Sequence, residues 1–195
     1  MIFDANSYYG VDIVSQSLRW QISRTPNTKI ITCGSAYFGG YDVFYNSGDS
    51  MQRTWENLPP HNSITYFFQI KLIDQWNISD SIQVTLDNLN FAFTIPVNGI
   101  NSYGDYSCGI SSVKDSELRI YGGLPHTSSQ LTLKLVNKRI LAAGTGTFAI
   151  RDVQILLNQA VFTSASHYIY SLYYVTAITG GLSPGCPWKT YYYDW

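Results

Sequence analysis

Residues 65–72 read TYFFQIKL, and this stretch decides the fold class because apolar and polar side chains alternate along it. Successive side chains of a β-strand point to opposite faces of its sheet. The apolar side chains therefore share one face: Tyr66, Phe68, Ile70 and Leu72. The polar side chains share the other face: Thr65, Gln69 and Lys71. A strand with one apolar and one polar face is typical of an antiparallel sheet that packs on a core.

The same alternation recurs on both sides of this stretch. It predicts half-buried strands at residues 18–22, 82–87 and 131–135. Clusters of Gly, Pro, Asn and Ser separate the strands and predict turns at 25–27, 39–40, 46–49, 58–62, 98–99, 122–125 and 144–146. No long helical periodicity interrupts the series, so we expect an all-β, antiparallel β-sandwich.

One predicted strand changes its pattern partway along. In residues 148–157, FAIRDVQILL, the apolar positions move from even to odd numbers at Asp152. A slip of one residue turns every later side chain of a strand to the opposite face. The pattern therefore predicts either a β-bulge at Asp152 or a strand that crosses between faces.

Composition excludes several classes of function. Lys and Arg number 12 against 13 Asp and Glu, so a formal net charge of -1 provides no broad positive field for nucleic acid or for an anionic membrane surface. No apolar run is long enough to predict a membrane-spanning helix. Charged residues make up only 13% of the chain, so electrostatic repulsion between copies is weak and favours self-association.

The chain is predicted to have two parts. Residues 1–159 form the sandwich domain, including an N-terminal strand arm, and residues 160–195 form a C-terminal strand and an extended aromatic tail. The boundary follows a change in composition to Tyr, Ser and Thr with little charge. Two interpretations of the tail stay open: it packs back on its own sandwich, or it docks on a neighbouring copy by strand addition.

Several ordered blocks resemble one known family. They are FGGYDVF at 38–44, LPPH at 58–61, QIKLIDQW at 69–76, the pair Cys108-Gly109, HTSSQLTL at 126–133 and AIRDVQI at 149–155. Together they resemble the jelly-roll-like β-sandwich modules of large cysteine-rich surface proteins of ciliated protozoa, over residues 30–158. The resemblance implies a jelly-roll-like sandwich in an extracellular or cell-surface protein, and it implies no catalytic activity.

The resemblance also bears on the cysteines and on calcium. It implies a disulfide between Cys33 and Cys108, and hence an oxidising setting. Cys186 is then left either as a buried free thiol or as the partner in an intermolecular disulfide. Members of the family look richer in acidic residues where calcium would bind, whereas this chain has NISD at 77–80 and AAGTGT at 142–147. Three carboxylates are weak calcium candidates, and no cofactor is expected: Asp74, Asp80 and Asp152.

The remaining sequence motifs give little support for catalysis. The triplet Asn77-Ile78-Ser79 is a sequon and predicts glycosylation of Asn77 on a surface loop. His61, His126 and His167 are far apart in sequence without metal-ligand spacing, and we expect turn or surface histidines that make local hydrogen bonds. No nucleophile elbow or phosphate-binding loop is present in the sequence, so the protein is not expected to be an enzyme.

Aromatic side chains suggest sugar binding as one function. Flat rings stack on the apolar face of a pyranose. Trp20, Trp55 and Trp76 are candidates for such stacking, but Trp55 and Trp76 fall in or beside the blocks quoted above and are expected to pack in the core. Tyr103 and Tyr106 lie in a polar stretch and are the candidates for stacking on a glycan.

Two functions follow from these observations. The leading hypothesis is a secreted, non-enzymatic subunit of an extracellular filament or surface coat, whose partner is itself. Its assembly residues are the aromatic side chains of the tail: Tyr168, Tyr170, Tyr173, Trp188, Tyr191, Tyr192, Tyr193 and Trp195. The N-terminal stretch 1–20 is the alternative assembly arm. The second hypothesis is a carbohydrate-binding, lectin-like surface module whose partners are glycans.

Overall fold

A computed structural model describes the protein over residues 2–6, 18–26, 28–77, 79–87, 91–96, 105–140, 146–164, 166–171 and 175–178. All regular structure in these ranges is β-strand. The strands are β1 (Ile2–Asn6), β2 (Gln21–Ile22), β3 (Ile30–Cys33), β4 (Ser35–Gly39), β5 (Ser50–Trp55), β6 (Ser63–Asp74), β7 (Ser81–Leu86), β8 (Phe91–Pro96), β9 (Ser116–Pro125), β10 (Leu131–Asn137), β11 (Gly146–Asn158), β12 (Ser166–Ser171) and β13 (Val175–Ile178).

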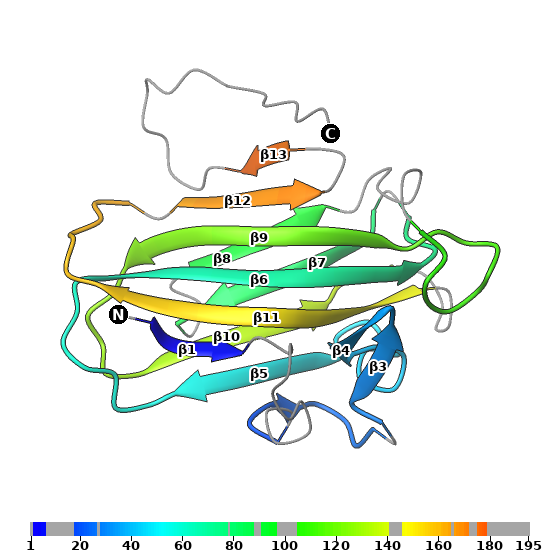
Figure 1. Ribbon diagram of the computed structural model, residues 1–195, viewed down its shortest axis with the longest axis horizontal. Helices are drawn as coiled ribbons and strands as arrows, with labels where there is room; N and C mark the ends of the chain where they lie inside the picture. The colour runs from blue at the N-terminus through cyan, green and yellow to red at the C-terminus, as the bar shows by residue number, and fades with distance from the viewer. Residues whose placement is uncertain are drawn as a thin grey trace.

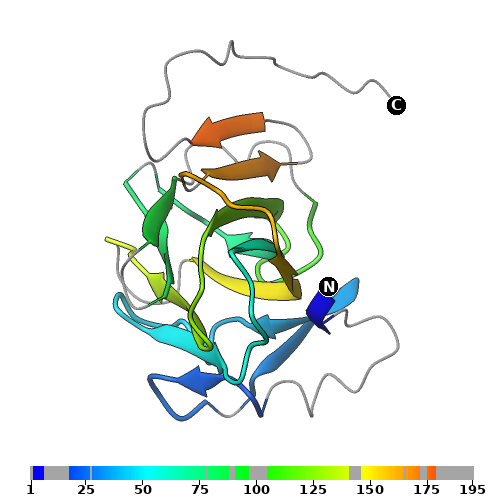
Figure 2. The ribbon, with the colours of Figure 1, turned by 90° about the vertical axis from the view of Figure 1, so that its left-hand side faces the viewer.

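The strands form two antiparallel sheets that pack face to face. The first sheet has eight strands in the order β13-β12-β9-β6-β11-β4-β3, with β1 also paired to β11. The second has five strands in the order β2-β5-β10-β7-β8. Figure 1 looks onto the first sheet, with β7, β8 and β10 behind it, and Figure 2 views the two layers after a turn of 90°. The protein is an antiparallel, jelly-roll-like β-sandwich, as predicted.

The core lies between the sheets and follows the alternation of β6. Tyr66, Phe68, Ile70 and Leu72 are completely buried, and Leu131, Leu133 and Leu135 of β10 meet them from the second sheet. Trp55 and Trp76 are buried there, which confirms the expectation that they pack in the core, and Trp20, a stacking candidate, is buried as well.

A β-bulge occurs at the point where β11 changes its pattern. The pairing of β11 with β6 shifts register between Arg151 and Gln154. Asp152 has a φ of 52°, which a non-glycine residue rarely adopts. The extra residue keeps Phe148 and Ile150 before the bulge, and Val153 and Ile155 after it, on the buried face. This confirms the β-bulge at Asp152, the first of the two alternatives that the sequence pattern predicted.

The prediction of a strand over residues 18–22 is wrong for most of that range. Only Gln21 and Ile22 pair with β5, and Leu18 lies in a turn with 73% of its surface exposed. Trp20 anchors the segment, with its ring centroid 6.4 Å from that of Trp55 and 5.9 Å from that of Phe38, and Ile22 packs partly buried against the same core. Trp20 and Ile22 hold the chain against the core, and the Leu18 side chain stays at the surface.

The C-terminal strands extend the first sheet. β12 pairs with β9 of the same chain, and β13 pairs with β12 at the edge of the sheet (Figure 1). For residues 166–171 the structure therefore agrees with the interpretation that the tail packs back on its own sandwich. Tyr168 and Tyr170 belong to β12. The other assembly candidates and Cys186 lie outside the described residues: Tyr173, Trp188, Tyr191, Tyr192, Tyr193 and Trp195. The boundary at residue 159 and the assembly role stay predictions.

A search of the described ranges finds no helix of the length and apolar character needed to cross a membrane.

Candidate functional site

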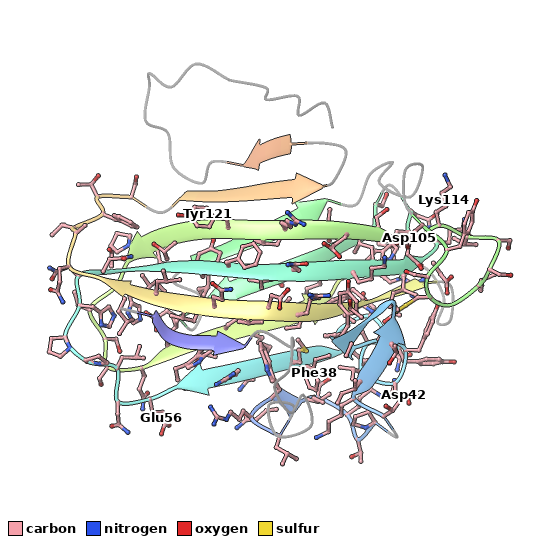
Figure 3. The ribbon with its side chains drawn as sticks, in the orientation of Figure 1. Phe38, Asp42, Glu56, Asp105, Lys114 and Tyr121 are labelled. Carbon is pink, nitrogen blue, oxygen red and sulfur yellow. A yellow bond between two sulfur atoms is a disulfide. The ribbon has the colours of Figure 1, made fainter. Side chains whose placement is uncertain are left out.

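A disulfide fixes one end of the sandwich. It joins Cys33 at the end of β3 to Cys108 in the loop 105–115, which confirms the pairing implied by the resemblance. The loop lies at the end of the molecule where Asp105 and Lys114 are labelled in Figure 3. The disulfide therefore ties this loop to the edge of the first sheet.

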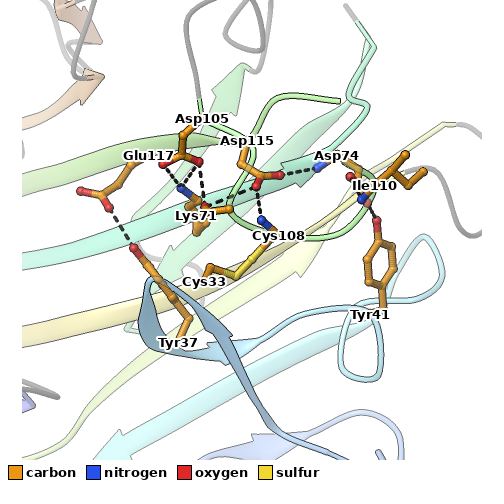
Figure 4. Close-up of a disulfide and its surroundings, with 11 residues drawn as sticks. Cys33, Tyr37, Tyr41, Lys71, Asp74, Asp105, Cys108, Ile110, Asp115 and Glu117 are labelled. Atoms are coloured by element: carbon orange, nitrogen blue, oxygen red, sulfur yellow. Dashed lines mark hydrogen bonds and ion pairs between the residues drawn. A yellow bond between two sulfur atoms is a disulfide. The ribbon is translucent and has the colours of Figure 1, made fainter. Parts of the chain in front are cut away.

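Asp115 braces the loop from inside. Its carboxylate is completely buried and accepts hydrogen bonds from the backbone N–H groups of Cys108, at 2.6 Å, and Asp74, at 3.0 Å (Figure 4). The backbones of Asp105 and Asp115 also exchange two hydrogen bonds, of 3.0 and 2.6 Å. Because a charged acceptor makes stronger hydrogen bonds than a neutral one, Asp115 fixes the loop against the end of β6.

Asp74 holds the far side of the same loop. It ends β6 with a φ of 58° and accepts hydrogen bonds from the backbone N–H of Ile110, at 2.6 Å, and from the Tyr41 hydroxyl. Burial raises the pKa of the Asp74 carboxyl, the Ile110 hydrogen bond opposes that shift, and the charge of Asp115 adds to it. Gly109, with a φ of 57°, lies so close that a Cβ there would collide with the Asp74 carboxylate. The Cys-Gly pair thus needs its glycine.

Asp105 carries a third contact between the loop and the sheet. The buried ammonium of Lys71 lies 2.8 and 3.1 Å from the two Asp105 carboxylate oxygens, and the Ser107 hydroxyl donates to one of them at 2.7 Å. Burial alone would raise the pKa of the Asp105 carboxyl, but the hydrogen bonds and charge of Lys71 and the Ser107 hydroxyl hold it below the ordinary value. The exposed carboxylate is therefore ionised at neutral pH and held in one place.

A hollow of about 320 Å³ lies beside this braced loop, and Tyr106 stands at it. The Tyr106 side chain is 58% exposed, and the Lys114 ammonium lies 5.8 Å from its ring centroid. The structure thus places one of the two stacking candidates at a cavity, whereas Tyr103 lies outside the described residues. The cavity is lined by Ile31, Thr32, Cys33, Tyr41, Ile73, Tyr106, Ser107, Cys108, Gly109 and Ser111. It combines an exposed ring with hydroxyl groups.

The three calcium candidates accept hydrogen bonds from protein groups. Asp80 bonds the backbone N–H groups of Ile140, at 2.8 Å, and Asn77, at 2.9 Å. Asp152 accepts from the side chains of Gln69, at 2.9 Å, and Arg151, at 2.8 Å. Within the described ranges no three His, Cys, Asp or Glu side chains gather around a point that could hold a metal ion. Asp74, Asp80 and Asp152 each hold backbone or side-chain groups of the protein, and calcium binding by them stays a prediction.

Asn77, the sequon residue, lies in the loop after β6. Its side chain is half-buried and its amide nitrogen is covered by the surrounding protein. A glycan on Asn77 would require this amide to turn outward. Glycosylation at Asn77 stays a prediction.

Two histidines meet at the opposite end of the sandwich, which the sequence did not predict. His61 and His126 are buried, with His61 Nε2 and His126 Nδ1 2.7 Å apart and their rings stacked at 5.0 Å. Both lie between strands, and His61 Nδ1 makes the expected local hydrogen bond to the Pro59 carbonyl, but the two rings are buried and contact each other, which was not expected. The pairing of β6 with β9 brings Ser63 opposite Pro125, and so brings the preceding and following turns together. His167 lies in β12.

We expect acidification between about pH 7 and pH 5 to destabilise the protein through His126. Burial lowers the pKa of His126 below its ordinary 6.5, and the charge of His61 adds to this, while Asp87 and the backbone of Gln130 oppose it in part. The unfolded chain therefore takes up a proton at higher pH than the native protein, so stability falls as the pH drops through the unfolded value. Urea unfolding at several pH values would measure this, and H126Q should flatten the dependence. An equal dependence in both proteins would contradict the assignment.

Comparisons with known proteins find a likeness in structure only. No family model matches the chain, and no curated protein matches its sequence. A xylan-binding domain of carbohydrate-binding module family 22 is 14% identical with a TM-score of 0.38, over 83% of this chain and 97% of that one. A mannan-recognising carbohydrate-binding module is 9% identical with a TM-score of 0.37, over 80% of this chain and 96% of that one.

A glucuronidase of family GH115 with specificity for decorated arabinogalactans also resembles part of the chain. It is 13% identical with a TM-score of 0.33, over 69% of this chain and 18% of that one. The chain thus spans less than a fifth of that enzyme. The fold assignment rests on the strand pairing described above.

Proposed function

We propose that this protein is a non-enzymatic, carbohydrate-binding module of the lectin-like kind, and that it binds glycans at the hollow beside Tyr106. The carrying observation is that an exposed aromatic ring stands on a loop held by a disulfide and two buried carboxylates. A binding loop that is ordered before its ligand arrives loses little conformational entropy on binding.

The chemistry of the hollow suits a neutral sugar ring. The apolar face of a pyranose would pack on Tyr106, and hydroxyls of Thr32, Ser107 and Ser111 would exchange hydrogen bonds with the sugar hydroxyls. The exposed Asp105 carboxylate, next to Ser107, adds an acceptor close by. Asp74 and Asp115 accept backbone hydrogen bonds that hold the loop, so we assign them structural and not catalytic roles.

The proposed setting is extracellular or at the cell surface. A disulfide persists in an oxidising compartment, and the Cys33–Cys108 bridge supports that placement. The resemblance to modules of ciliate surface proteins points the same way and stays a prediction.

We expect Tyr106→Ala to abolish glycan binding at the hollow beside the loop 105–115 while the protein stays folded. Loss of one well-placed stacking ring should weaken binding roughly tenfold or more, which takes a weak lectin below detection. The measurement is retention on a glycan array, followed by calorimetric titration with the best glycan. Tyr45→Ala is the matched control, because Tyr45 is 44% exposed with the Arg24 guanidinium 5.3 Å from its ring, yet it lines neither hollow.

Two results would count against this function. One is a uniformly negative array with folded protein, and the other is equal loss of binding in the Tyr106 and Tyr45 variants. The first result would remove glycan binding at the Tyr106 hollow, and the second would move the binding site away from that hollow.

The filament hypothesis depends on the tail, most of which lies outside the described residues. Within them, β12 pairs with β9 of its own chain, so Tyr168 and Tyr170 already belong to a sheet. Negative-stain electron microscopy of the purified protein would test the hypothesis, since dispersed monomers at all concentrations would exclude it.

A further inference from the structure

A second hollow, of about 390 Å³, lies at the end of the sandwich opposite Tyr106. Figure 1 shows the turns β5–β6 and β9–β10 at one end of the first sheet and the loop 105–115 at the other. The hollow is lined by Asn62, Asp87, Pro125, His126, Thr127, Ser128, Val161 and Phe162. It therefore combines a carboxylate, an imidazole, an amide and hydroxyls with an apolar wall.

The histidine pair lies buried behind the Asp87 side of this hollow, with the His126 side chain 1% exposed. His61 Nδ1 lies 2.7 Å from the Pro59 carbonyl oxygen, which can only accept, so His61 donates there. The Nε2 of neutral His61 then accepts the hydrogen bond from His126 Nδ1, at 2.7 Å. The lone pair of neutral His126 is consequently on Nε2, 3.8 Å from an Asp87 carboxylate oxygen. Two acceptors lie side by side.

The apolar wall of the hollow needs a glycine beneath it. The Phe162 ring lies on Gly123 of β9 so closely that a Cβ at Gly123 would meet Phe162 Cε2 at 2.5 Å. Val161, which precedes Phe162 in the chain, is 73% exposed. An apolar pair thus stands at the hollow without being part of the core.

We propose that this hollow is a second binding site, for a neutral saccharide, that is separate from the Tyr106 site. Because the partly exposed Asp87 carboxylate is an acceptor, the ligand must supply hydrogen-bond donors, and sugar hydroxyls do so. The carboxylate disfavours anionic ligands. The C–H face of a sugar ring would lie against Phe162 while its hydroxyls reach Asp87, Thr127 and Ser128. The site does not require that glycans bind at Tyr106.

Proton NMR of the histidine rings would test the second site directly. The full chain would be titrated with glucose, galactose, mannose, xylose and N-acetylglucosamine, each to millimolar concentrations. At least one sugar should shift the ring C–H signals of His126, identified by their absence in H126Q. No shift with any of these sugars would overturn the proposal. A shift with methylammonium alone would also overturn it, because the site would then select a cation.

Substitutions separate this site from the first. Asp87→Asn should weaken the sugar affinity, measured from the shift of the His126 signals, roughly tenfold, because it replaces a charged acceptor with a neutral one. Asparagine tolerates the φ of 54° at this position, so the variant should fold. Phe162→Ala should weaken binding as well, whereas Tyr106→Ala should leave the His126 shift unchanged. If Tyr106→Ala abolishes it, the second site does not exist as a separate site. If glycans do not bind at Tyr106 but the sugar-dependent shift of His126 is still observed, only the Tyr106 site is excluded.

Discussion

The double variant C33S/C108S is expected to lose about 4 kcal/mol of its free energy of unfolding. The disulfide spans a sequence separation of 75 residues, and closing so long a loop removes much entropy from the unfolded chain. For a chain of this size the loss corresponds to a fall in Tm of roughly 10 °C. The loop 105–115 should also loosen, so the Tyr106 site should weaken even where the sandwich stays folded.

Urea unfolding of the oxidised protein and of the double variant would measure this difference. The oxidised protein treated with a reductant is a useful control, because it removes the same bond without changing a residue. A difference below about 1 kcal/mol would show that the bridge adds little to stability.

Phe148→Ala is expected to cost about 3–5 kcal/mol, the other large effect. Phe148 is completely buried in β11, its ring lies stacked at 3.8 Å on that of Phe44, and the Trp76 ring lies 6.3 Å away. Removal of the ring leaves a cavity between two aromatic side chains that have little freedom to fill it. Since native domains are stable by only about 5–15 kcal/mol, this variant should lose a large fraction of its free energy of unfolding.

Tyr121→Ala is the matched control for Phe148→Ala. Tyr121 is also an aromatic residue inside a strand of the first sheet, but 45% of its surface is exposed. Its loss should cost less than about 1 kcal/mol. Equal costs in the two variants would mean that strand propensity, and not core packing, determines the effect.

The sandwich could be predicted because its signal is local. Alternation in β6, β7 and β10 shows which side chains face inward, and the change of pattern at Asp152 locates the bulge without any knowledge of the neighbouring strands. The same reasoning failed at Leu18, where three apolar residues with the right spacing resemble a strand but the first of them stays exposed at the surface.

The site depends on contacts between distant parts of the chain. His61 and His126 are 65 positions apart, and nothing in either turn indicates the other. The carboxylates of Asp74 and Asp115 brace the loop through backbone N–H groups, which leave no mark on the sequence. Tyr106 was accessible to prediction only because its neighbours are polar, and that pattern could not show the hollow beside it.

The placement of the disulfide also has a mechanical consequence. Cys33 and Cys108 enclose β4 to β8, so a pull on the two ends of the chain bypasses everything between them. With 75 residues removed from the load path, the chain extends by about 260 Å less than its length would allow. Under tension, β1 can peel away from β11 while the strands behind the bridge keep their length, so the protein yields from its termini inward.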